Sequence, residues 1–91
     1  MLQERNGSRT IATEVVDVTV LGCELRVFAP VDVDQTGRLG YEIRERTAWM
    51  PVRVRSVRRG ARGWTVACAF DRPTPEQQRS IYAFMAECHN G

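Results

Sequence analysis

The feature that most constrains the fold is a pair of alternating segments on either side of a turn rich in arginine and glycine, residues 58–63. Residues 49–57 carry valines that alternate with arginines, and residues 64–70 alternate large side chains with small ones. Strict alternation is the pattern of a strand with one buried face, so the two segments predict an antiparallel hairpin. The small side chains of Ala67 and Ala69 would let another group pack closely on the opposite face.

Three further strands are predicted upstream of this hairpin. Residues 10–19 are rich in β-branched side chains and end before Gly22. Residues 22–29 alternate, with Cys23, Leu25 and Val27 on the face expected to be buried. Residues 39–44 form a short strand in which Tyr41 and Ile43 share the inner face.

A helix is predicted over residues 74–88. Thr74 is a good N-cap, Pro75 suits the first helical position, and Gln77 completes a Thr-x-x-Gln capping box. An apolar stripe at helical spacing must then pack on the sheet: Ile81, Phe84, Met85 and Cys88.

This order of elements predicts an α+β fold that is mainly β, in which an antiparallel sheet curls into a small barrel and one C-terminal α-helix covers it. The chain has 91 residues, enough for a single domain. We divide it into an N-terminal arginine segment (1–9), a β-barrel (10–70) and a C-terminal helix (74–88).

Composition limits the function classes. All 13 basic side chains are arginine, which suits planar recognition of phosphate and guanine, yet the net charge of +2 is too small to indicate nucleic-acid binding. A basic ribbon on the hairpin also lacks the interleaved aromatic side chains that single-strand binders use for stacking, so nucleic acid is not the predicted partner. The ribbon comprises Arg53, Arg55, Arg58, Arg59 and Arg62.

The remaining residues point to a cytoplasmic binding protein. Three distant cysteines (Cys23, Cys68 and Cys88) lack the spacing of a disulfide framework or a zinc site, and His89 beside Cys88 supplies too few ligands, so we expect reduced thiols and no metal or cofactor. No secretory signal is visible and no apolar run approaches a membrane span. No catalytic triad or phosphate loop is present, so we do not expect an enzyme.

Two short motifs carry a resemblance to a known family. Residues 5–9 form Arg-x-x-x-Arg, and residues 17–22 form Asp-x-Thr-x-x-Gly. Together they resemble the signature of PilZ domains, small bacterial β-barrels that bind the second messenger cyclic di-GMP. The downstream order of hairpin, Asp-Arg-Pro-Thr-Pro-Glu-Gln and helix is similar to the same family, so the resemblance covers residues 12–88.

The resemblance implies cyclic di-GMP as ligand and five residues as its site. Arg5 and Arg9 would pair with guanine or phosphate, and Asp17 would accept hydrogen bonds from the N1–H and N2–H₂ edge of guanine. Thr19 would offer a neighbouring hydroxyl, and Gly22 would let the backbone approach the ligand without a Cβ.

The spacing of the two motifs leaves three alternatives open. Seven residues separate Arg9 from Asp17, and a straight strand would place them about 26 Å apart. The N-terminal segment folds back near Asn6 and Gly7, a second subunit supplies the arginines, or no cyclic dinucleotide site exists. A missing first strand would leave a sheet edge, which predicts a homodimer.

Two functions are therefore considered. The first is a PilZ-like cyclic di-GMP receptor or adaptor in bacterial second-messenger signalling. The alternative is a divergent PilZ-like module that binds a protein partner in motility, pilus or exopolysaccharide machinery and no nucleotide.

Overall fold

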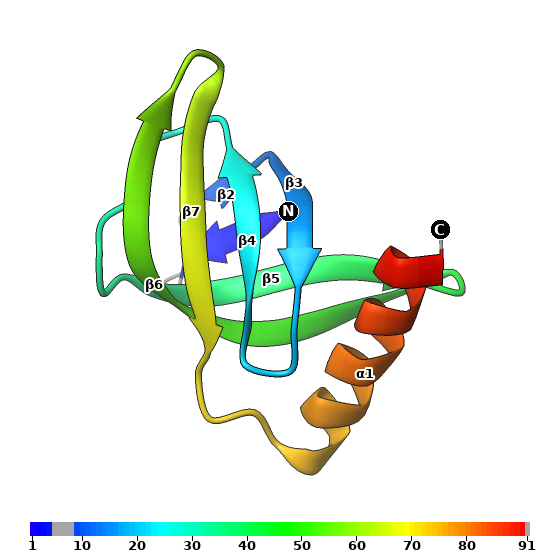
Figure 1. Cartoon of the computed structure of the whole chain (residues 1–91). Helices are drawn as coiled ribbons and strands as arrows, with labels where there is room; N and C mark the ends of the chain where they lie inside the picture. The colour runs from blue at the N-terminus through cyan, green and yellow to red at the C-terminus, as the bar shows by residue number, and fades with distance from the viewer. Residues whose placement is uncertain (5–8, 91) are drawn as a thin grey trace.

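The computed structural model describes residues 1–4 and 9–90 of the chain. In this part of the chain the strands come first and a single helix follows (Figure 1). The elements are β1 (Leu2–Glu4), β2 (Thr10–Ile11), β3 (Thr13–Val18), β4 (Gly22–Val27), β5 (Thr36–Ile43), β6 (Arg46–Gly60), β7 (Gly63–Phe70) and α1 (Pro75–Asn90).

The strands form one mainly antiparallel sheet in the order β2-β1-β5-β6-β7-β4-β3. The 15-residue strand β6 joins its two halves, because the first part of β6 pairs with β5 and the later part pairs with β7. Figure 1 shows β6 bending so that the β5 side of the sheet runs across the β7 side. The predicted class, mainly antiparallel β with a C-terminal helix, is confirmed.

The two ends of the sheet follow each other in the chain. The end strands β2 and β3 are separated by Ala12 alone, whose carbonyl accepts a hydrogen bond from Phe28 N at 3.4 Å. The strand predicted over residues 10–19 is therefore broken near its start. This break lets one stretch of chain leave one end of the curled sheet and enter the other.

The alternating residues predicted to face inward form the core. Leu25, Val27, Val52 and Val66 are almost completely buried, as the strand patterns predict. Helix α1 packs on this core through Ile81 and Phe84, and the Phe84 ring lies 4.0 Å from the Tyr41 ring between centroids. Cys88, predicted on the same stripe, is instead exposed, because the core contact of the helix ends a turn earlier.

Three boundaries differ from the sequence-based expectation. Strand β1 lies in the segment assigned to arginine recognition, and it pairs with both β2 and β5. The β5–β6 turn consists of Arg44 and Glu45, both with positive φ (50° and 69°), so β6 begins earlier than predicted. The turn predicted over residues 58–63 shortens to two residues because Gly60 still pairs with Gly63.

The helix begins where the capping motif predicts. The Thr74 hydroxyl accepts a hydrogen bond from Gln77 N at 3.1 Å, and the Gln77 side-chain oxygen accepts one from Thr74 N at 2.8 Å. These reciprocal bonds satisfy amides that the first helical turn leaves without an intrahelical partner.

Candidate functional site

The Asp-x-Thr-x-x-Gly motif forms the turn between β3 and β4. Thr19 N donates to Gly22 O at 2.8 Å, and the Thr19 hydroxyl accepts from Leu21 N at 3.2 Å while lying 3.4 Å from Gly22 O. A short hydroxyl side chain that bonds to nearby backbone is a recurrent turn device. Thr19 thus holds the hairpin in shape.

Gly22 is required by the approach of a neighbouring strand. A Cβ placed on Gly22 would lie 2.0 Å from Cys68 O and 3.0 Å from Ala69 Cα, both in the backbone of β7. The space beside Gly22 is therefore filled by protein. Gly22 therefore serves the close packing of β4 against β7, and the close approach of a ligand expected from the resemblance stays a prediction.

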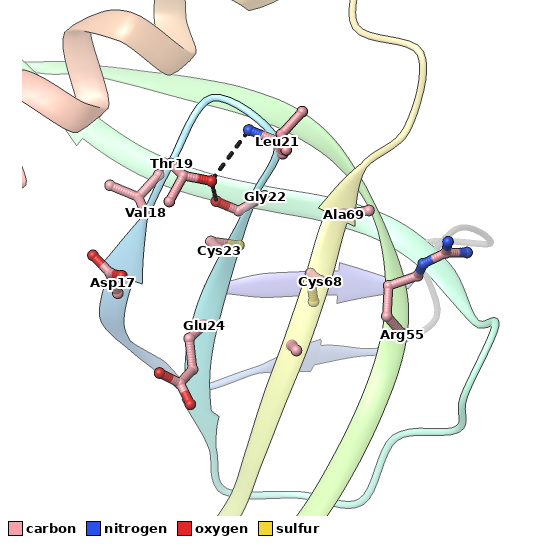
Figure 2. A pocket seen from close by; sticks show the side chains of 11 residues that line it. Asp17, Val18, Thr19, Leu21, Gly22, Cys23, Glu24, Arg55, Cys68 and Ala69 are labelled. Carbon is pink, nitrogen blue, oxygen red and sulfur yellow. Dashed lines mark hydrogen bonds between the residues drawn. The ribbon is translucent and has the colours of Figure 1, made fainter.

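A cavity of about 330 Å³ opens beside this turn. Asp17, Thr19 and Gly22 line it, and Ala67 and Ala69 of β7 contribute small side chains between the hairpin and β6 (Figure 2). Cross-strand pairing links Gly22 to Ala69 and Glu24 to Ala67, so β4 and β7 together form the base. The sequence predicted that another group could pack closely over these two alanines, and in the structure this face of β7 lines the cavity.

Asp17 lies near the C-terminal part of α1 as well as in this cavity. It is exposed on β3, opposite Glu24 of β4. Burial, followed by the negative charges of Asp17 and Glu87, raises the pKa of the Cys88 thiol. The carboxylate of Asp17 is thus close enough to α1 to act on the Cys88 thiol.

Comparison with known protein families identifies the family of this chain. A model of the PilZ domain matches residues 2–87, which is nearly the whole chain. The chain is a PilZ domain. Neither the curated proteins nor the solved structures gave a match.

Membership of the PilZ family fixes the class of activity. PilZ domains are non-catalytic binding domains, and the family is one of cyclic di-GMP receptors. The expectation that the chain is no enzyme is therefore confirmed by its family. Within the described residues, no group of three metal-ligating side chains could hold a metal ion, and no helix is long and apolar enough to cross a membrane.

Arg9 of the arginine motif is separated from the hairpin motif. Arg9 Nε donates to Glu4 Oε1 at 2.9 Å, and Arg9 Nη2 donates to Pro30 O at 3.0 Å. Pro30 follows the Val27 end of β4, whereas Asp17, Thr19 and Gly22 gather at the opposite end of the β3–β4 hairpin. Arg5 lies outside the described residues.

The structure brings to the cavity two residues that the sequence did not assign to the site. Glu24 lines it from β4, and Arg55 lines it from β6, on the far side of β7 from Asp17 (Figure 2). Arg55 lies where the β6–β7 register shifts, between Val54 and Ser56, so it is the extra residue of a bulge. Alternation alone could not assign such a residue to the cavity.

Proposed function

We propose that this PilZ domain is a cyclic di-GMP receptor or adaptor that acts in the cytoplasm in bacterial second-messenger signalling. One observation carries the proposal: the signature residues Asp17, Thr19 and Gly22 meet around an open cavity whose base is made of small side chains. A flat guanine can approach the backbone closely over Ala67 and Ala69. The family supplies the ligand class.

The three signature residues have different expected roles. We expect Asp17 to accept hydrogen bonds from the N1–H and N2–H₂ edge of guanine, because a carboxylate is the natural acceptor for adjacent donors. We expect Thr19 and Gly22 to keep the hairpin in the shape that presents Asp17, since the hydroxyl bonds within the turn and the glycine packs against β7.

Calorimetric titration with cyclic di-GMP tests this function. Asp17→Ala should weaken binding by roughly ten- to a hundredfold, the loss expected when a bidentate contact to a base worth ~1–3 kcal/mol is removed. Glu14→Gln is the matched control, because Glu14 is an exposed carboxylate on the same strand that pairs with Arg26 instead of lining the cavity. Absence of heat from the unaltered domain at hundreds of micromolar ligand would contradict the proposal.

The alternative, a protein-interaction module that binds no nucleotide, has its own supporting observation. Arg9 is held by Glu4 and Pro30 away from the hairpin, while the hairpin tip presents Val20 and Leu21, the latter 79% exposed. A partner from motility, pilus or exopolysaccharide machinery that binds equally with and without cyclic di-GMP, and is lost on Leu21→Ser, would favour this function.

A further inference from the structure

A second cavity, of about 450 Å³, lies between β5, β6 and the connection from β7 to α1. Its charged lining is basic, because the guanidinium groups of Arg38, Arg53 and Arg72 are accompanied by a single carboxylate, that of Asp71. The cavity beside the β3–β4 turn, which we call the hairpin cavity, has an acidic charged lining, because the carboxylates of Asp17 and Glu24 are accompanied by a single guanidinium, that of Arg55. We call the second one the arginine cavity.

The two cavities are neighbours on the outer face of the sheet. Ala69, which lines the hairpin cavity, pairs with Gly22 on one side and with Arg53 on the other, and Arg53 pairs in turn with Thr36. Residues directly opposite one another in antiparallel strands share a face. Val52 and Val54 are buried, so Arg53 between them points away from the core, as does Ala69.

This row of four residues crosses β4, β7, β6 and β5. Neighbouring strands lie about 4.8 Å apart, so the row from Gly22 to Thr36 spans about 14 Å. A surface of that length can contact both units of a ligand made of two nucleotides. The acidic part of this surface lies at the hairpin and its basic part at the arginine cavity.

Two of the arginines are held in place by their neighbours. Arg38 Nε donates to Gln3 Oε1 at 3.1 Å, and the Arg38 guanidinium carbon lies 4.5 Å from the centre of the Trp49 ring. Arg53 Nη1 donates to Asp34 O at 3.3 Å. A guanidinium has five N–H donors, so each keeps donors for a further acceptor, and its restraint lowers the entropy lost on binding.

Arg72 has a strained backbone. Its φ of 49° is unfavourable for a residue with a Cβ, and it precedes Pro73. Arg72 makes no hydrogen bond or ion pair with the described residues that would account for this conformation. Strained residues in folded proteins gather at functional sites, and here the strained residue lines the arginine cavity.

We propose that the arginine cavity is the phosphate subsite of the cyclic di-GMP site, and that Arg53 and Arg72 take the part that the sequence assigned to Arg9. This inference rests on the proposed function. Arginine pairs bidentately with phosphate oxygens, while the carboxylate of Asp17, which lines the hairpin cavity near the Gly22 end of the row, suits the donor edge of guanine. The chain thus recruits its phosphate-binding arginines from β6 and the β7–α1 connection.

The test is a set of calorimetric titrations with cyclic di-GMP on the whole domain. Arg53→Ala and Arg72→Gly should each weaken binding roughly tenfold or more, as for loss of one charge-assisted pair. Arg9→Ala should bind like the unaltered domain. Arg59→Ala is the matched control, because Arg59 is an exposed arginine of β6 that lines neither cavity.

Thermal melting separates lost binding from lost folding. Glycine adopts positive φ without a Cβ clash, so Arg72→Gly should melt at or above the temperature of the unaltered domain while binding more weakly. If the unaltered domain binds and Arg53→Ala and Arg72→Gly bind equally well, or Arg9→Ala loses as much, the inference is wrong and the proposed function stands. If the unaltered domain does not bind, both are wrong.

Discussion

At the scale of single residues, Gly22 shows how a family motif serves the fold. A Cβ at this position would lie 2.0 Å from the carbonyl oxygen of Cys68, so β4 and β7 would have to separate. We expect Gly22→Ala to lower the free energy of unfolding by about 1–3 kcal/mol, the usual cost of forcing extra atoms into a packed region. Urea denaturation measures this as a lower midpoint.

Gly60→Ala is the control for that measurement. A Cβ on Gly60 would meet Gly63 O at 3.6 Å, an ordinary contact, and its backbone does not require glycine. The free energy of unfolding of Gly60→Ala should stay within about 0.5 kcal/mol of that of the unaltered domain, so its urea midpoint should hardly change. Equal midpoints for the two variants would contradict the packing role of Gly22.

The sequence predicted part of the candidate site at this scale. Asp17, Thr19 and Gly22 lie within six consecutive residues, so a turn keeps them together whatever the rest of the fold does. Arg9 is close to Asp17 in sequence yet lies near the other end of β3, because an extended chain places residues far apart even when few positions separate them. Arg53 and Arg72 depend on strand pairing between distant segments, which no local pattern encodes.

At the scale of elements, hydrophobic alternation predicted the buried faces of strands, and the capping motif predicted the start of the helix. The buried faces of β4, β6 and β7 and the start of α1 follow from the side-chain pattern. The β5–β6 turn did not, because Arg44 and Glu45 adopt positive φ without the Asn or Gly residues typical of such turns. The break at Ala12 also lacks a local signal, since it depends on β2 and β3 lying at opposite ends of the strand order.

The capping box gives a prediction at this scale. Thr74→Ala removes the hydroxyl that accepts from Gln77 N, so we expect a loss of about 1 kcal/mol in the free energy of unfolding. Ser80→Ala removes a hydroxyl from the same helix, one that bonds to Glu76 O within the helix, and should change stability little. Guanidinium denaturation followed by circular dichroism compares the two. A Ser80 variant as unstable as the Thr74 variant would show that capping is not the cause.

At the scale of the whole molecule, the domain is two halves of one sheet sharing β6, with α1 packed on the core. The helix contacts β3, β5 and β6, which belong to both halves, so its docking ties them together. The homodimer expected from an open sheet edge stays a prediction, which light scattering at high micromolar concentration tests. The structure has a short strand, β1, between β2 and β5, and it lies upstream of both sequence motifs.

The reactivity of the three cysteine thiols reports on the packing of the whole domain. Cys23 and Cys68 pair across β4 and β7 and are buried, whereas Cys88 is exposed. The thiolate attacks thiol reagents only where they can reach it, so at pH 8 we expect the exposed Cys88 to react first, at a rate reduced by its raised pKa, and the other two thiols only as fast as the domain unfolds. Denaturant should release all three. Two fast thiols in the native protein would mean that β4 and β7 separate locally.

The same thiols predict how stability depends on pH. The hydrogen bond with Cys68, together with burial, raises the pKa of Cys23, and partial burial raises that of Cys88, whereas the same hydrogen bond lowers the pKa of Cys68. The two raised thiols outweigh the lowered one. A raised pKa means that the folded domain binds the thiol proton more tightly than the unfolded chain does. The stabilisation is therefore complete below the unfolded thiol pKa of about 8.5 and decreases above it. The urea midpoint of the unaltered domain should decrease as the pH rises from 8 to 10. The midpoint of Cys23→Ala should decrease less over the same pH range.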